Sequence, residues 1–180
     1  ATNLLQEIKK NTSLRVSLKR VAVSLEKDDL SKFNFLYLSG LDDFKLSQDA
    51  IYAIRNFLNS GGTLFINNGL GMSTFDSSIR REIKKILPGA SLSSIPTNHP
   101  IFNAAFNINK VDYTPLAYQQ RRSQIPLLEG ISINGELKVI YSPFDIEAGW
   151  QGCEHVLCKG YLPESALKVG INIIVYSATH

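Results

Sequence analysis

His99 and Asp145 are the side chains of this sequence best suited to acid–base chemistry. A histidine, with an ordinary pKa of about 6.5, can donate or accept a proton near neutral pH. Asp145 follows an apolar segment and could act as a general base or a ligand, and Glu129 and Glu147 could join it. Such a set could hydrolyse an amide, an ester or a glycoside, with or without a metal ion. The alternatives are structural: His99 holds a loop beside Pro100, and Asp145 accepts backbone N–H bonds.

Five further polar or aromatic residues follow segments that we predict to be strands, or lie in a neighbouring loop. The ligand crevice of an open α/β sheet lies beyond the carboxyl ends of its strands. Trp150, the only tryptophan, could stack there on a sugar or a base, or could cover the sheet edge. The predicted ligand-binding residues are Asp42, Asn67, Asn68, Ser142 and Trp150.

Two cysteines, Cys153 and Cys158, lie on either side of His155. We interpret them as ordinary thiols, with a local disulfide or a partial metal site as alternatives. Three side chains are too few for a zinc site without a distant fourth ligand. The sequence therefore predicts no metal and no cofactor.

The composition is that of an ordinary globular protein, with 44% hydrophobic and 19% charged residues. It excludes disordered, collagen-like and coiled-coil classes, and no apolar run reaches the roughly 18 residues of a transmembrane segment. We predict one α/β domain over residues 1–180. The net charge of +3 predicts no nucleic-acid partner, because that function would need scattered basic residues on one surface. These residues are Arg80, Arg81, Lys84, Lys85, Arg121 and Arg122.

The first half of the chain predicts a parallel strand–helix–strand unit. A short helix ending at Asn11 comes first, and alternating residues in 14–18 and 21–23 predict one or two strands. Residues 33–38 and 63–67 read as buried strands, joined by a helix that begins at Ser47 and stops at Gly61. Such a unit favours a right-handed parallel crossover.

The second half predicts helices and a hairpin. A helix capped by Asp76 precedes a long irregular excursion over one end of the sheet, residues 90–126. Asn134-Gly135 is the favoured dipeptide of a tight hairpin turn between strands 131–133 and 137–141. Residues 147–150 are predicted to be a loop, and 166–178 a buried helix.

Several of these stretches, taken in order, resemble domain of unknown function 4159, a bacterial family grouped with the class I glutamine amidotransferase-like superfamily. The resemblance implies a flavodoxin-like three-layer sandwich with a mostly parallel central sheet. It also implies an exported or periplasmic location and partner proteins in the cell envelope. The stretches are 33–40, 46–47, 61–65, Asn98–Phe102, Glu129-Gly130, 139–142 with Asp145, Gly149-Trp150, and 170–178 from Gly170-Ile171-Asn172 onwards.

Two departures from the superfamily pattern bear on function. Catalytic amidotransferases present a cysteine on a tight Gly-x-Cys-x-Gly turn after a strand, whereas Asn67–Gly71 contains neither a thiol nor a hydroxyl. The family is also acidic around positions 67 and 68, where this chain has asparagines, which cannot act as general bases. We therefore do not expect glutaminase activity.

The sequence predicts a non-catalytic module that binds a small molecule or another protein. The alternative is a hydrolase that uses His99 and Asp145, with or without a metal. The chain begins with a helix, whereas a flavodoxin-like sheet begins with a strand. We expect that first strand to be absent or to be supplied differently.

Overall fold

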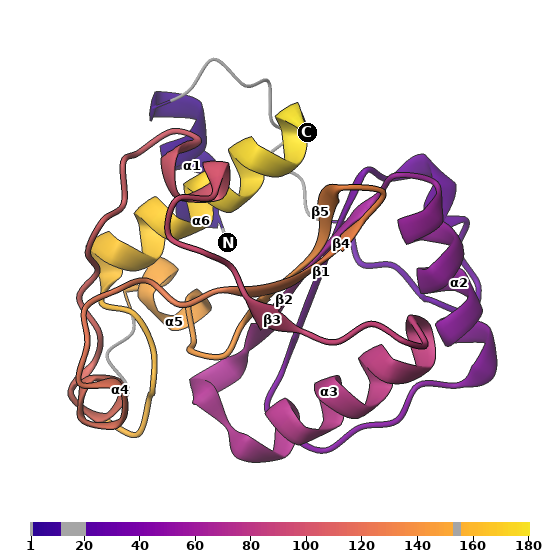
Figure 1. The fold of residues 1–180 in the computed structure, drawn as a ribbon, viewed down its shortest axis with the longest axis horizontal. Coiled ribbons are helices and arrows are strands. Elements are labelled where there is room, and N and C mark those ends of the chain that lie inside the picture. The colour runs from indigo at the N-terminus through magenta and orange to yellow at the C-terminus, as the bar shows by residue number, and fades with distance from the viewer. Residues whose placement is uncertain (1, 12–20, 153–155) are drawn as a thin grey trace.

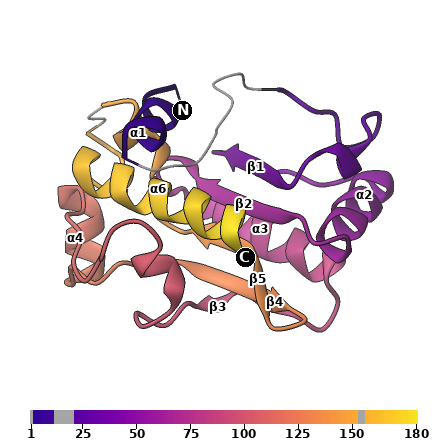
Figure 2. The ribbon, with the colours of Figure 1, turned by 90° about the horizontal axis from the view of Figure 1, so that it is seen from above.

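The computed structural model describes residues 2–11, 21–152 and 156–180, which form a central sheet with helices on both faces (Figures 1 and 2). The five strands of these residues have the order β1-β2-β5-β4-β3. Their bounds are β1 Phe35–Gly40, β2 Thr63–Asn68, β3 Ser93–Ser94, β4 Glu129–Ile133 and β5 Glu136–Ser142. The chain is thus an α/β protein, as predicted.

The prediction of a mostly parallel sheet is wrong, because the sheet is mixed. β1 pairs with β2 and β2 with β5 in parallel, whereas β5 pairs with β4 and β4 with β3 in the antiparallel direction. The reason is the hairpin itself. Asn134 and Gly135 have φ values of 54° and 86°, as a tight turn of this kind requires, and β5 therefore runs back antiparallel beside β4. The predicted hairpin is confirmed.

One face of the sheet is covered by α2, Gln48–Asn59, and α3, Ser73–Ile86. The Ser47 hydroxyl caps α2 by accepting a bond from the Ala50 N–H at 3.2 Å, as predicted. Asp76 does not cap α3, which begins three residues earlier. It lies in the first turn instead and accepts bonds from Tyr141 on β5 and Arg80 on α3.

The opposite face is covered by α6, Pro163–Thr179, with α1, Thr2–Asn11, packed beside it (Figure 2). The predicted buried helix over 166–178 is therefore confirmed. Residues 147–150 are not a loop, because Glu147–Trp150 forms the short helix α5, which contacts α6. The excursion 90–126 contains β3, a 3₁₀ turn at Pro100–Asn103 and α4, Pro115–Arg121.

The strand predicted over 14–18 lies outside the described residues. The companion segment 21–23 is described and is not a strand. Helices of the described ranges lack the combination of length and apolar character that crossing a membrane requires.

A buried carboxylate on α3 fixes the loop that follows β1. Glu82 is 0% exposed and accepts bonds from Lys85 at 2.9 Å, Arg81 at 2.8 Å and the Leu46 N–H at 3.3 Å. Burial favours its neutral form, but the bonds from Lys85 and Arg81 outweigh burial and hold the pKa of Glu82 below its ordinary value.

We predict that acid removes the contribution of Glu82 to stability. A carboxyl group whose pKa is lowered by folding stabilises the protein above its unfolded pKa of about 4.3, and this contribution disappears as the pH falls through the folded pKa. Glu82→Gln should therefore lower the urea midpoint at about pH 6, and the difference from wild type should shrink towards about pH 3. An equal difference at both pH values would contradict this assignment.

Candidate functional site

Asp145 lies just beyond the carboxyl end of β5 and is 4% exposed. Its Oδ1 accepts bonds from Asn67 Nδ2 at 2.9 Å and from the Glu147 N–H at 2.8 Å. Its Oδ2 accepts a bond from the Leu70 N–H at 2.8 Å, and the Cys158 Sγ lies 3.9 Å from it. Within the described ranges, no cationic side chain forms an ion pair with this carboxylate. Neutral donors from separate segments therefore stabilise its charge.

Asn67 and Asn68, at the end of β2, form with Asp145 a corner of the sheet where β2 and β5 end. Both asparagine side chains are fully hydrogen-bonded. Asn67 Oδ1 accepts a bond from the Ile146 N–H at 2.9 Å. Asn68 Nδ2 donates to the carbonyls of Met72 at 3.1 Å and Pro143 at 3.2 Å, and its Oδ1 accepts from the Met72 N–H at 3.0 Å. Each amide links the end of β2 to the segment that follows β5.

Ser142 and Trp150 are also directed inward. The Ser142 hydroxyl, 0% exposed, donates to the Phe144 carbonyl at 2.6 Å. Trp150 Nε1 donates to the Ala166 carbonyl on α6 at 2.8 Å. Gly170, also on α6, lies directly against the indole, since a Cβ atom there would be 2.6 Å from Trp150 Nε1. Trp150 therefore joins α5 to α6.

The connection from β2 to α3 contains a left-handed residue that is not glycine. Leu70, between Gly69 and Gly71, has φ 53° and ψ 6°. A strained turn from a strand into a helix is where many hydrolases hold their nucleophile, with nearby backbone N–H groups stabilising the oxyanion. Here the side chain of Leu70 is aliphatic, and the Leu70 backbone N–H donates to the Asp145 carboxylate. The turn carries a residue that cannot react, and this N–H is already occupied.

His99 lies elsewhere, at the start of the 3₁₀ turn Pro100–Asn103. Its Nδ1 accepts a bond from the Ile101 N–H at 3.2 Å, and its ring centroid is 5.3 Å from that of Tyr176 on α6. Burial, and to a lesser degree nearby His180, lowers the pKa of His99. The residue borders a hollow of about 340 Å³ beside β3 and β4, together with four serines: Ser91, Ser93, Ser94 and Ser132.

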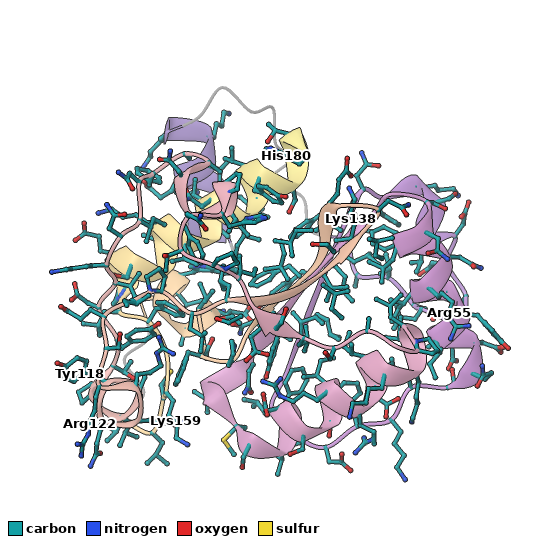
Figure 3. All side chains as sticks on the ribbon, viewed as in Figure 1. Arg55, Tyr118, Arg122, Lys138, Lys159 and His180 are labelled. Carbon is teal, nitrogen blue, oxygen red and sulfur yellow. The ribbon has the colours of Figure 1, made fainter. Side chains whose placement is uncertain are left out.

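The structure does not bring His99 and Asp145 together. Trp150, from the corner of Asp145, contacts Ala166, whereas His99 contacts Tyr176. Ten positions of α6 separate these two contacts, which corresponds to about 15 Å of helix. The Asp145 N–H donates to the Lys159 carbonyl, and Figure 3 shows Lys159 far from His180 at the end of α6.

Asp42 lies apart from the other predicted ligand-binding residues. It is exposed, two positions beyond the end of β1. Its neighbour Asp43 makes the local contacts, because it accepts bonds from Ser78 and Arg81. Asn67, Asn68, Ser142, Asp145 and Trp150 are each no more than 4% exposed.

The predicted cysteine and histidine set can be described only in part. Cys153 and His155 lie outside the described residues, and Cys158 is buried. In the part of the chain that the structure describes, no three metal-ligating side chains cluster.

The basic residues of α3 are largely engaged with carboxylates. Arg80 donates to both oxygens of Glu129, at 2.8 and 3.0 Å, while Arg81 and Lys85 bind Glu82. Arg121 belongs to α4, at a different end of the molecule (Figure 1), where its guanidinium lies 5.7 Å from the centre of the Tyr113 ring.

One accessible pair beside the corner was not predicted as a site. Tyr37 on β1, 38% exposed, donates its phenolic proton to Glu147 Oε2 at 2.8 Å. Its ring lies 5.4 Å from Phe65 and 6.0 Å from Trp150, measured between centroids. Although part of the side chain is exposed, desolvation of the phenol, and secondarily the carboxylate of Glu147, raises the pKa of Tyr37 above its ordinary range. Residues two apart on a strand lie on the same face, so the polar residue Ser39 could have indicated from the sequence that the face of Tyr37 is exposed to solvent.

This arrangement defines an α/β protein in which the carboxyl ends of the strands, the common place for a ligand site, are joined by hydrogen bonds between buried polar groups. A family model described as a domain of unknown function (DUF4159) matches residues 1–178. The chain belongs to this family, as the resemblance predicted. A comparison with curated proteins gives no match.

Proposed function

We propose that this chain is a non-catalytic, amidotransferase-like module with a flavodoxin-like fold, and that it acts by binding another protein. The observation that carries the proposal is the closed corner around Asp145. There the carboxylate accepts the N–H of Leu70, the residue at the turn where an enzyme of the superfamily would hold its nucleophile. An occupied donor and an aliphatic side chain leave this turn without the parts for acyl transfer.

Burial favours a protein over a small molecule as the ligand. The buried residues of the predicted crevice are hydrogen-bonded to one another or to the backbone. A small molecule would have to break these bonds to reach them, which carries a large desolvation cost. A partner protein needs only the outer surface, and the family resemblance implies partners in the cell envelope.

The alternative of a hydrolase using His99 and Asp145 is less well supported. A base and the group that orients it must lie within hydrogen-bonding distance, directly or through one water. The contacts of His99 are with Ile101 and Tyr176, and those of Asp145 are with Asn67, Leu70 and Glu147.

The test is a hydrolysis screen with chromogenic amide, ester and glycoside substrates, with and without added zinc or magnesium. We expect rates no higher than the uncatalysed background. Any activity found should be repeated with Asp145→Asn and His99→Gln proteins whose folding is verified by circular dichroism. Turnover that disappears in both folded variants would overturn the proposal and support the hydrolase.

A further inference from the structure

We propose that the outer edge of β1 is the docking site for an extended segment of a partner protein in which apolar and basic residues alternate. This inference rests on the proposed function, since it names the surface and the partner chemistry of the binding module. It is carried by the backbone of β1, by the exposed face around Tyr37 and by the charge beside it.

The backbone of β1 offers an unused set of hydrogen-bonding groups. Among the described strands, β1 lies at the edge of the sheet, with β2 on one side. In a parallel pair, alternate residues direct both their N–H and their C=O to the same neighbour. The Asn34 carbonyl accepts from the Thr63 N–H at 2.9 Å, so the groups of Phe35, Tyr37 and Ser39 point away from β2. Among the described residues, these outward groups have no backbone partner.

The two faces of β1 differ in a way that specifies the partner's side chains. Leu36 is buried and Leu38 half-buried towards the cluster under α2 and α3. On the other face, Tyr37 and Ser39 are exposed, although the neighbouring strand β2 is buried along its whole length. A strand added beside β1 would place alternate side chains against the leucines and against Tyr37. The partner side chains that lie against Leu36 and Leu38 must therefore be apolar.

The negative charge near Tyr37 indicates which partner side chains would lie on the other face. The Glu147 carboxylate accepts the Tyr37 phenol and has no ion-pair partner in the described parts of the chain. Asp42, exposed just beyond β1, adds a second negative charge. A lysine or arginine could lie against the Tyr37 ring and beside Glu147, gaining both cation–π and ionic contacts.

The same charges argue against two other occupants. An acidic segment would bring like charges together at Glu147 and Asp42. A second copy of β1 would bring its own Glu147 to the same face, and like charges at close range disfavour such a pairing.

The experiment uses fluorescein-labelled peptides of about seven residues, the length of a typical strand, that alternate either valine and lysine or valine and glutamate. Binding to the full chain is measured by fluorescence anisotropy at low and high salt. We expect the lysine peptide to bind at least about tenfold more tightly than the glutamate peptide, and its affinity to fall as salt rises. Equal binding of the two peptides, or no binding of either, would overturn the inference.

A matched pair of variants tests the backbone contact. Ser39→Pro removes the hydroxyl and one outward N–H, whereas Ser39→Ala removes the hydroxyl alone. We expect the proline variant to bind the lysine peptide at least about tenfold more weakly than the alanine variant. Glu147→Gln should weaken binding of the lysine peptide several-fold and should not weaken binding of the glutamate peptide. Equal affinity of the proline and alanine variants would overturn the docking mode.

Hydrogen exchange of the wild-type chain keeps the inference testable if Ser39→Pro does not fold. The amides of Tyr37 and Ser39 should exchange rapidly in the protein alone and slow down when the lysine peptide is added, while those of β4 remain unchanged. Protection of these amides before any peptide is added would show that the edge is already occupied, and would overturn the inference. A failure here leaves the proposed function intact, because that function falls only if turnover depends on His99 and Asp145.

Discussion

Replacing Asp145 by alanine is expected to lower the free energy of unfolding by at least about 3 kcal/mol, because one buried and two partly buried donors lose their acceptor at once. Asn67 Nδ2 and the N–H groups of Leu70 and Glu147 all donate to this one carboxylate. Leaving a buried donor unsatisfied costs about 1–3 kcal/mol each. Urea unfolding followed by circular dichroism measures the loss.

Two further variants separate this cost from the general effect of losing a carboxylate. Asp145→Asn keeps the shape but turns an NH₂ group towards donors, so it should recover only part of the stability. Asp42→Ala, at an exposed site, should change the free energy of unfolding by no more than about 0.5 kcal/mol. An Asp145→Ala protein as stable as wild type would refute a structural role for this residue.

Gly170→Ala is expected to destabilise the protein by about 1–3 kcal/mol, the usual cost of overpacking a core. In an exposed helix the same change would stabilise by about 0.5–1 kcal/mol. In α6, however, the new Cβ would meet three atoms of the Trp150 indole at 2.6–2.8 Å. The ring cannot simply rotate away, because Nε1 is bound to the Ala166 carbonyl.

The indole itself provides the readout. Trp150 is the only tryptophan in the sequence, so a displaced ring should shift the fluorescence emission of the native protein towards the red as it becomes hydrated. Ser177→Ala, in the same helix, should leave both the emission and the stability unchanged within about 0.5 kcal/mol. Greater stability in Gly170→Ala than in wild type would mean that Gly170 and the Trp150 indole are not in close contact in solution.

Local sequence patterns correctly predicted the helix start and the hairpin, which depend on only a few neighbouring residues. Ser47 predicted the start of α2, and the Asn134-Gly135 dipeptide predicted the hairpin, because a cap and a tight turn depend on a few neighbouring residues. The same hairpin should have corrected the expectation of a mostly parallel sheet, since it forces β4 to run antiparallel to β5.

The candidate site was harder to predict, because its meaning depends on contacts between distant segments. The sequence correctly placed Asn67, Asn68 and Asp145 near strand ends. It could not show that Asn67 binds Asp145 or that Asn68 binds the Pro143 carbonyl. An asparagine after a strand has the same local pattern whether it faces a ligand or a buried carbonyl. The exposed pair of Tyr37 and Glu147 was missed for the same reason, since its members are joined only through folding.

The position of β5 has a kinetic consequence. It is linked to β4 by a two-residue turn, yet its other neighbour is β2, with Leu64 opposite Val139. A hairpin closes in microseconds, whereas pairing across a long loop must first overcome the entropy of closing that loop. We therefore expect β4 and β5 to associate early in refolding and the docking of this preformed pair onto β2 to limit the rate. Substitutions at the β2–β5 contact should then slow folding, whereas changes at the β1 edge should mainly affect unfolding.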